Sequence, residues 1–327
     1  MLSRQTLRAS RGFAACFVSP QTPVLKNQRV PFSLSSKRSS AMRFIRYETS
    51  GRQGLGVALK EDDSIFDLTS FDPSVGASMQ AFIAGGEDSV LKAKKAIENG
   101  KNVLPQDQVR ILAPISDPGK ILCVGMNYRD HCEEQNIPVP KEPVIFSKFN
   151  NSIIGPNDSI KYPDETEELD WEVEFVIIIG KEGKNIQESK AMEYVFGYTV
   201  AHDVSARDWQ LQRNGNQFLI GKSMDTFCPL GPAIVTKENI KDPHNLKLWT
   251  LVNGVTKQEG NTSEMVFKTE AVIAFISRFF TLQPGDIILT GTPPGVGVFQ
   301  NPPEFLKRGD VVEVGVEGIG SITNKIE

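Results

Sequence analysis

The chain reads LDWEVEFVIII at residues 169–179, and this stretch decides what the rest of the sequence can build. Its acidic residues alternate with apolar ones, which predicts an extended strand with three carboxylates on one face and three apolar side chains on the other. The acidic residues are Asp170, Glu172 and Glu174. The apolar run 176–179 follows directly, so the strand enters a core, where neighbouring carboxylates repel one another unless a cation holds them.

A second apolar stretch, residues 195–201, ends at His202 and Asp203 and supplies another acid. Side chains two residues apart on a strand start about 7 Å from each other, so Glu172 and Glu174 can close on one ion while Asp203 reaches it from a neighbouring strand. These ligands are hard oxygens, which favour Mg²⁺, Mn²⁺ or Ca²⁺ over zinc. The alternative is a solvated acidic sheet edge without metal. The core-like flanks and the second acid favour the metal site.

Length and composition bound the class of protein. The 327 residues suit two domains or one large one, and 39% hydrophobic with 23% charged residues is ordinary for a globular protein. No apolar run approaches the roughly 18 residues that cross a bilayer, so we expect neither a transmembrane segment nor a membrane partner. The four cysteines have no CxxC spacing, which predicts reduced thiols rather than disulfides or a zinc site.

The first 47 residues hold nine Lys or Arg and eight Ser, and the first acid is Glu48. This composition predicts a disordered mitochondrial transit peptide over residues 1–41 and a matrix location; a basic arm that is not cleaved is the alternative. The remaining chain has 27 basic against 40 acidic residues, a net charge of −13. Nucleic acid is therefore excluded as an expected partner, because its binding needs a basic surface.

Two domains are predicted after the arm. Residues 42–114 read as a small α+β domain, with strands at 44–49 and 54–68 and a helical stretch at 79–99 that is broken at Gly85 and Gly86. Residues 115–327 hold all the candidate metal-binding, acid/base and substrate-binding residues and form the predicted catalytic domain.

A histidine pair is the candidate acid/base group. His131 and Glu134 are three apart, hence on one face if the piece is helical, and can form a hydrogen-bonded pair. A lone histidine is usually structural, but the carboxylate partner and the loop that Gly125 starts favour a functional reading. His202 points away from Asp203 along a strand, so we expect it to be structural or to support the site.

Two further stretches have two readings each. Lys222 follows the apolar run FLIG, so it is either a partly buried cation aimed at an anionic ligand or a surface lysine with a buried stem. Residues 291–298, GTPPGVGV, follow a predicted strand at 287–290. This loop either offers backbone N–H groups and the Thr292 hydroxyl to a carboxylate or is a rigid connector.

Five segments taken together resemble one family. GMNYRDHCEE, LDWEVEF, AHDVSARDWQ, GKSMDTFCPLGP and ILTGTPPGVG occur in that order, and together they look like the fumarylacetoacetate hydrolase family, most closely a mitochondrial branch of it. The resemblance covers about Leu112 to the C-terminus, and in that branch the N-terminal unit as well. It implies an α+β, mostly β fold, a mixed β-sandwich roll, and a homodimer.

The resemblance also implies the roles of individual residues. It implies Mg²⁺ or Mn²⁺ held by Glu172, Glu174 and Asp203, and it excludes Asp170 from the metal. A lid would carry the catalytic pair His131 and Glu134, with Lys222 as a third catalytic residue. The implied substrate contacts are Arg207, Gln210, Thr292 and Lys148.

Family substrates are small anionic 2-oxo acids, which a divalent ion activates by stabilising the enolate formed when a proton leaves C3. The resemblance implies a tautomerase that converts enol-oxaloacetate to keto-oxaloacetate. An acylpyruvate-type C–C hydrolase and an oxaloacetate decarboxylase use the same site and stay open. A non-catalytic metal-binding scaffold is the remote alternative, and a base beside the acids argues against it.

Overall fold

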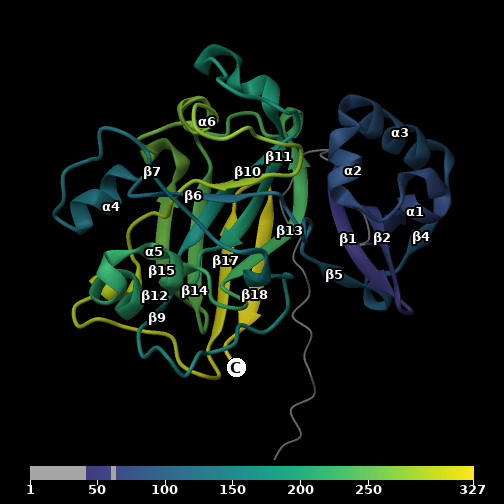
Figure 1. Cartoon of the computed structure of the whole chain (residues 1–327). Helices are drawn as coiled ribbons and strands as arrows, with labels where there is room; N and C mark the ends of the chain where they lie inside the picture. Colours follow the sequence, from purple (N-terminus) through teal and green to yellow (C-terminus); the bar gives the residue numbers. More distant parts are fainter. Residues whose placement is uncertain (1–41, 60–63) are drawn as a thin grey trace, which may run out of the picture. The chain divides into compact units, whose positions relative to one another are not determined.

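The computed structural model describes residues 42–59 and 64–327 (Figure 1). The transit peptide predicted for residues 1–41 lies outside the described residues, as does Cys16. Over the described part the fold is α+β and mostly sheet, as predicted. No helix in that part is long and apolar enough to cross a membrane.

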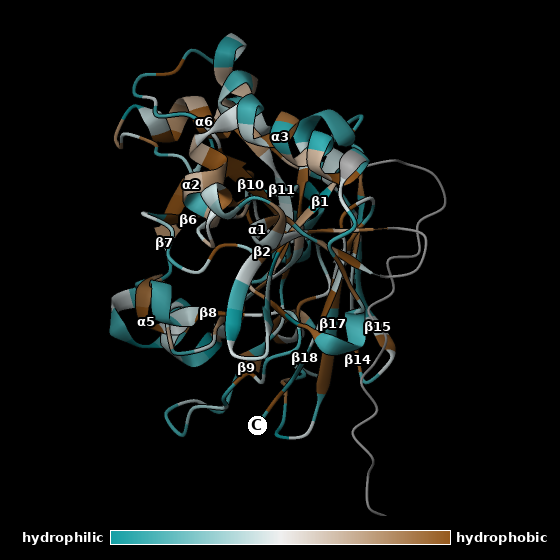
Figure 2. Cartoon of the chain, turned by 90° about the vertical axis from the view of Figure 1, so that its right-hand side faces the viewer, coloured by the Kyte–Doolittle hydropathy of each residue, from teal (hydrophilic) through white to brown (hydrophobic). Residues whose placement is uncertain are grey.

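The strand β10 (Val173–Ile179) is buried along its whole length. It pairs antiparallel with β11 (Val195–His202) on one side and with β16 (Ile287–Leu289) on the other. Phe175 and Ile177 belong to one hydrophobic cluster, whereas Val176 and Ile178 belong to a second. Where a strand is covered on both faces by hydrophobic clusters, consecutive residues are apolar, which explains the run 176–179. Figure 2 shows this hydrophobic centre around β10 and β11.

The largest sheet has twelve strands in the described residues, in the order β4-β3-β2-β1-β13-β11-β10-β16-β6-β7, with β5 paired to β1 and β8 to β13. The β16–β6 and β13–β8 pairs are parallel, so the sheet is mixed. Its other strands are β1 (Arg43–Thr49), β2 (Arg52–Ala58), β3 (Ile65–Asp67), β4 (Val103–Leu104), β5 (Arg110–Leu112), β6 (Ile121–Gly125), β7 (Val144–Ser147), β8 (Ile153–Ile154) and β13 (Cys228–Thr236).

A second sheet covers one face of β10 and β11. It has the order β15-β14-β17-β18, and Leu248 and Val314 share a hydrophobic cluster with Ile177. Its strands are β14 (Lys247–Val252), β15 (Val255–Asn261), β17 (Val311–Val316) and β18 (Gly320–Lys325). Asn253 and Gly254, which join β14 to β15, have φ values of 51° and 78°, the left-handed backbone that a two-residue hairpin turn requires. The two sheets give the predicted sandwich.

Six α-helices alternate with the strands along the described chain. They are α1 (Leu68–Phe71), α2 (Met79–Ala84), α3 (Gly86–Asn99), α4 (Arg129–Glu134), α5 (Phe218–Lys222) and α6 (Thr269–Ser277). The predicted break at Gly85 separates α2 from α3. Phe82 and Ile83 of α2 share the second cluster with Val176. Because β1 pairs with β13, the strands before residue 68 continue the large sheet; the domain boundary at residue 114 stays a prediction.

Candidate metal centre and active site

Four chain segments converge at one end of the strands of the large sheet, called the site edge below. β10 starts there at Val173, and its antiparallel partners β11 and β16 end there. β6 runs parallel to β16 and ends at the same edge. The residues just outside these strands are therefore brought together, although they lie far apart in sequence: Glu172, His202 and Asp203, Thr290 to Thr292, and Asn127 to His131.

Three carboxylates meet at the site edge. Glu172, Glu174 and Asp203 each offer an oxygen within 4.8 Å of the other two, and all three residues are buried. The Asp203 backbone N–H donates to the Glu172 carbonyl at 2.9 Å, which fixes the two acids side by side. The predicted strand is interrupted at Trp171 and Glu172, between β9 (Leu169–Asp170) and β10.

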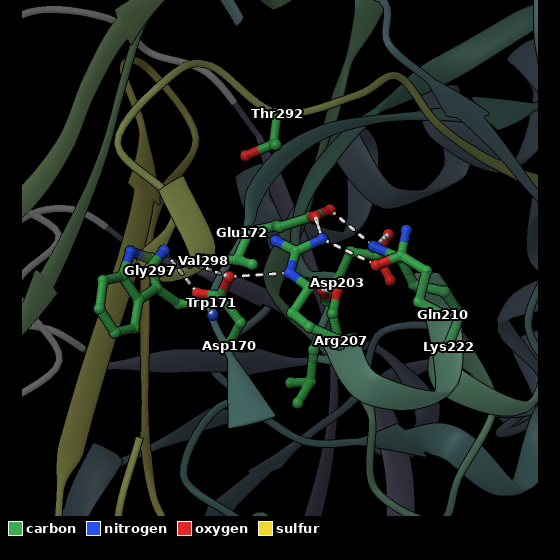
Figure 3. Close-up of polar contacts among 12 residues, drawn as sticks. Asp170, Trp171, Glu172, Asp203, Arg207, Gln210, Lys222, Thr292, Gly297 and Val298 are labelled. Carbon is green, nitrogen blue, oxygen red and sulfur yellow. Dashed lines mark hydrogen bonds and ion pairs between the residues drawn. The ribbon is translucent and has the colours of Figure 1, made fainter. Parts of the chain in front are cut away.

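Three buried basic side chains contact the triad: Lys148, Arg207 and Lys222. Figure 3 shows Arg207 and Lys222 beside Glu172 and Asp203. Lys222 Nζ lies 2.8 Å from Glu172 Oε2 and 2.8 Å from Asp203 Oδ2. Lys148 Nζ also contacts Asp203, at Oδ1, and donates to the Val204 carbonyl. Lys222 is 1% exposed, so the reading as a surface lysine is wrong. It is a buried cation that faces carboxylates of its own chain.

Glu174 is different from the other two acids. Its Oε2 accepts the Gly291 backbone N–H at 2.7 Å, and across residues 42–59 and 64–327 no basic nitrogen forms an ion pair with it. Burial, together with the charges of Asp203 and Glu172, raises the pKa of Glu174 well above its usual value. Burial also acts to raise the pKa of Glu172, but the charges of Lys222 and Arg207 outweigh it and lower that pKa to about 2.

A divalent cation suits this arrangement. Two oxygens on opposite sides of one ion lie about 4–5 Å apart when metal–oxygen distances are about 2.1–2.5 Å, so the 4.8 Å limit on the triad is compatible with a shared ion. The donor set contains only carboxylate oxygens, which magnesium, manganese and calcium prefer. Of the three candidate ligands, Glu174 is the one that pairs with no basic side chain in the described residues.

Arg207 links the triad to two further side chains. Its Nη1 lies 2.7 Å from Glu172 Oε1 and donates to Gln210 Oε1 at 2.9 Å, while its Nε donates to Asp170 Oδ2 at 2.8 Å. Its Nη2 is buried and has no hydrogen-bond partner among the described residues. Arg207 follows β12 (Ser205–Ala206), which pairs with β9, so the pairing of these short strands brings the guanidinium to Asp170.

The predicted hydrogen bond between His131 and Glu134 is present, and its acid/base role stays a prediction. His131 and Glu134 lie on α4, and His131 Nδ1 is 2.7 Å from Glu134 Oε2. The other carboxylate oxygen, Oε1, accepts the Gly295 backbone N–H at 2.8 Å. An accepting carboxylate at Nδ1 selects the tautomer with the proton on that nitrogen, which leaves Nε2 as the basic one.

The loop after β16 binds carboxylates through its backbone, but they belong to the protein itself. The N–H groups of Gly291 and Gly295 donate to Glu174 and Glu134, and those of Gly297 and Val298 donate to Asp170. The Thr292 hydroxyl donates to the Val173 carbonyl and accepts from the amide of Gln258. In this structure Thr292 and Lys148 contact protein groups, and their predicted substrate contacts stay predictions.

Two features of the site escaped the sequence reading. Gln258 is fully buried, its Oε1 accepts the Val173 N–H, and its amide holds Thr292; the only signal was a glutamine at an inward position of a hairpin strand. Gly221 precedes Lys222, and a Cβ there would lie 2.7 Å from both the Ala206 carbonyl oxygen and the Gln210 nitrogen. Glycine is needed for this close approach of α5, which places Lys222 in contact with Glu172 and Asp203.

Comparison with known proteins gives a consistent set of relatives. Residues 120–327 match the family described as fumarylacetoacetate (FAA) hydrolase C-terminal. The chain is 52% identical over 308 residues to the mitochondrial oxaloacetate tautomerase fahd2 of Xenopus laevis, covering 93% of this chain and 97% of that protein.

Two solved structures are also similar. One is a fumarylacetoacetate hydrolase from Exiguobacterium antarcticum, with a TM-score of 0.78 and 38% identity over 88% of this chain and 99% of that one. The other is the maleylpyruvate hydrolase of Sphingobium sp. SYK-6 in complex with manganese(II) and pyruvate, with a TM-score of 0.72 and 28% identity over 87% and 98% of the two chains.

Proposed function

Because the chain belongs to the fumarylacetoacetate hydrolase family, we propose that it is a divalent-cation-dependent tautomerase that converts enol-oxaloacetate to keto-oxaloacetate. The observation that carries the proposal is the buried triad Glu172, Glu174 and Asp203, in a chain that is 52% identical to an oxaloacetate tautomerase. Mg²⁺ or Mn²⁺ is the proposed ion. The manganese in the related maleylpyruvate hydrolase supports this choice.

The charges of the site support an anionic substrate. Four buried carboxylates, counting Asp170, face three buried cations: Lys148, Arg207 and Lys222. When all four carboxylates are ionised, as a bound cation favours, they exceed the three cations by one negative charge, and a divalent cation changes this excess to one positive charge. A dianionic 2-oxo acid then enters a site of opposite sign, which favours its binding in a region shielded from solvent.

The cation, when bound, withdraws electron density from a 2-oxo acid and lowers the cost of the enolate form. The protein supplies the remaining functions. Arg207 Nη2 is a buried donor with no partner among the described residues, and it is the proposed contact for a substrate carboxylate. Gln210 fixes the guanidinium through Nη1, and Lys222 adds positive charge beside Glu172.

Tautomerisation moves one proton. The enol hydroxyl loses its proton, and a proton arrives at C3, so no atom is gained or lost. His131 Nε2 is the proposed proton carrier, and Glu134 holds its ring. Water can also reprotonate an enolate, so His131 assists this reaction, whereas C–C hydrolysis requires a base to activate water.

The test follows the enol form of oxaloacetate by its ultraviolet absorbance while pyruvate is assayed in parallel. With Mg²⁺ present, the protein should speed the loss of enol above the spontaneous rate and release no pyruvate. A chelator and the Glu172→Ala variant should both remove the effect. Release of pyruvate without faster ketonisation would overturn the proposal in favour of a decarboxylase or a hydrolase.

We also propose a mitochondrial matrix location and a homodimer. The acid-free, basic first 47 residues and the mitochondrial relative support the location. β7 is the last strand of the large sheet, and Phe149 and Phe280, which line a surface groove beside it, are 52% and 44% exposed. Within residues 42–59 and 64–327 no strand pairs with the outer side of β7. Such an edge with exposed aromatics supports contact with a second copy, which light scattering on the purified protein would test.

A further inference from the structure

Asp170 is fully buried and lies outside the metal triad, yet it accepts four hydrogen bonds. Its Oδ1 accepts the backbone N–H groups of Trp171 and Gly297, each at 2.7 Å. Its Oδ2 accepts the Val298 N–H at 3.0 Å and Arg207 Nε at 2.8 Å. A carboxylate with this many donors fixes the segments that supply them. Figure 3 shows Asp170 between Gly297 and Val298 on one side and Arg207 on the other.

One side leads to the acid/base pair. Gly297 and Val298 belong to the segment 295–299, whose first residue, Gly295, donates its N–H to Glu134 Oε1 at 2.8 Å. The last residue, Phe299, packs its ring against the His131 ring with centroids 6.0 Å apart. The same segment therefore touches both members of the pair and is anchored in its middle by Asp170.

The other side leads to the triad and the substrate. Arg207 continues from Asp170 to Glu172 Oε1 at 2.7 Å and to Gln210 Oε1 at 2.9 Å. Space around the anchor is tight. A Cβ at Gly297 would lie 2.8 Å from Asp170 Oδ1 and 1.9 Å from the Glu304 carbonyl oxygen, so the segment reaches the carboxylate only through glycine.

We propose that Asp170 is a positioning residue that couples the two halves of the site: it sets Arg207 for the substrate carboxylate and, through the segment 295–299, the His131–Glu134 pair for proton transfer. The inference rests on the proposed function for its catalytic consequence. Its geometric content, one carboxylate that orders both an arginine and a histidine, can be tested without turnover.

The test uses Asp170→Asn in the full chain. Asparagine keeps the volume and one accepting oxygen, but its NH₂ group cannot accept the hydrogen bonds that Oδ2 receives. We expect kcat to fall and KM to rise, with kcat/KM lower by about 10- to 100-fold. Calorimetry should give weaker binding of pyruvate in the presence of Mg²⁺, with binding of Mg²⁺ alone changed less than about threefold, because the triad is intact.

Nuclear magnetic resonance supplies a readout independent of activity. The chain has three histidines, so the ¹⁵N signals of the His131 ring can be assigned. They should move in Asp170→Asn, because Glu134 loses the support of Gly295. Asp286→Asn is the matched control: Asp286 is also fully buried, pairs with Lys120 at 2.8 Å and accepts a loop N–H from Gln283, at the opposite end of β16. It should lower stability and leave kcat, pyruvate binding and the His131 signals unchanged.

Phe299→Ala is the second variant, and it tests only the contact between the segment 295–299 and His131. Phe299 is 37% exposed, so its truncation should be tolerated by the fold. The His131 signals should move while pyruvate binding stays within about twofold. The proposal is overturned if either variant leaves the His131 signals unchanged, or if Asp286→Asn reproduces the effects of Asp170→Asn. Loss of pyruvate binding and shifted His131 signals in a protein without tautomerase activity would support the coupling and refute only the function.

Discussion

The backbone N–H of Gly291 donates to Glu174 Oε2 at 2.7 Å, and it holds the one carboxylate of the triad that no basic side chain of the described residues pairs with. We predict that Glu174→Gln abolishes the thermal stabilisation by Mg²⁺ without destabilising the metal-free protein. Glutamine still accepts the Gly291 hydrogen bond and removes repulsion from Glu172 and Asp203. In the wild type, Mg²⁺ at about 100 times its Kd should add about 2.7 kcal/mol.

Thermal unfolding with a chelator and with Mg²⁺ measures both effects. Glu182→Gln is the control, because Glu182 is exposed and lies away from the triad. A Mg²⁺ shift in Glu174→Gln equal to that of the wild type would place the ion elsewhere.

Lys222 is predicted to substitute for part of the charge of the metal. Its Nζ lies 2.8 Å from both Glu172 Oε2 and Asp203 Oδ2, so Lys222→Met leaves two buried carboxylates with less compensation. The metal-free variant should lose about 3–5 kcal/mol of unfolding free energy. Mg²⁺ supplies positive charge at the same place, so its stabilising effect should be larger in the variant than in the wild type.

Denaturant titrations with and without Mg²⁺ check this difference. Lys190→Met is the comparison, because Lys190 forms an exposed pair with Glu193 and should change stability by less than about 1 kcal/mol. Equal Mg²⁺ effects in the wild type and in Lys222→Met would contradict the shared location of the two charges.

His131 separates the candidate reactions. Its Nδ1 is 2.7 Å from Glu134 Oε2, which leaves Nε2 as the base. We predict that His131→Ala slows ketonisation of enol-oxaloacetate only modestly, by about tenfold or less, since solvent also delivers protons. Any hydrolysis of an acylpyruvate should vanish in the same variant. Complete loss of ketonisation with hydrolysis retained would reverse the two assignments.

The sequence predicted the elements of the site better than their contacts. Alternation at 170–174, the apolar strand before Asp203 and the three-residue spacing of His131 and Glu134 each depend on local periodicity, and the structure brings all of these residues to the site edge. What local patterns do not contain is the pairing across distant segments. Local patterns leave two interpretations of the loop at 291–298, a ligand-binding backbone or a rigid connector, and they do not show that Glu174, Glu134 and Asp170 accept its N–H groups.

The role of Asp170 shows the same limit. Within the motif it alternates with Glu172 and Glu174, so sequence alone places it in the acidic set. The short pairing of β9 with β12 instead brings Arg207 to it. The alternation itself holds, because Glu172 and Glu174 meet in the triad and Trp171, Val173 and Phe175 share one hydrophobic cluster. The single continuous strand does not, because it is interrupted at Trp171 and Glu172. Such breaks arise from tertiary contacts that periodicity does not encode.

Gly221 is predicted to be required for the position of Lys222. In Gly221→Ala the new Cβ would lie 2.7 Å from the Ala206 oxygen and the Gln210 nitrogen, so α5 must move away from the backbone that follows β12. Overpacking of this kind costs about 1–3 kcal/mol, and kcat/KM should fall at least tenfold because Lys222 and Gln210 are displaced. Gly125→Ala, whose Cβ would meet its nearest atom at 3.6 Å, should have little effect on either quantity. Comparable losses in both variants would remove the argument from close approach.

His202 makes the stability of the metal-free protein depend on pH. It is fully buried, neither ring nitrogen has a hydrogen-bond partner among the described residues, and burial together with the charge of Lys148 lowers its pKa to about 3 from an ordinary value of 6.5. In the unfolded chain His202 binds a proton as the pH falls through about 6.5, whereas in the folded chain it does so only near pH 3. This contribution to stability is fully present above the unfolded pKa and is lost as the pH falls, with a slope of up to about 1.4 kcal/mol per pH unit.

His202→Leu removes the titrating group, so urea unfolding with a chelator between pH 7 and pH 5 should show a smaller slope than the wild type by about that amount. Parallel curves for the two proteins would mean that His202 titrates over the same pH range in the folded and unfolded states, so that its pKa is not lowered by folding.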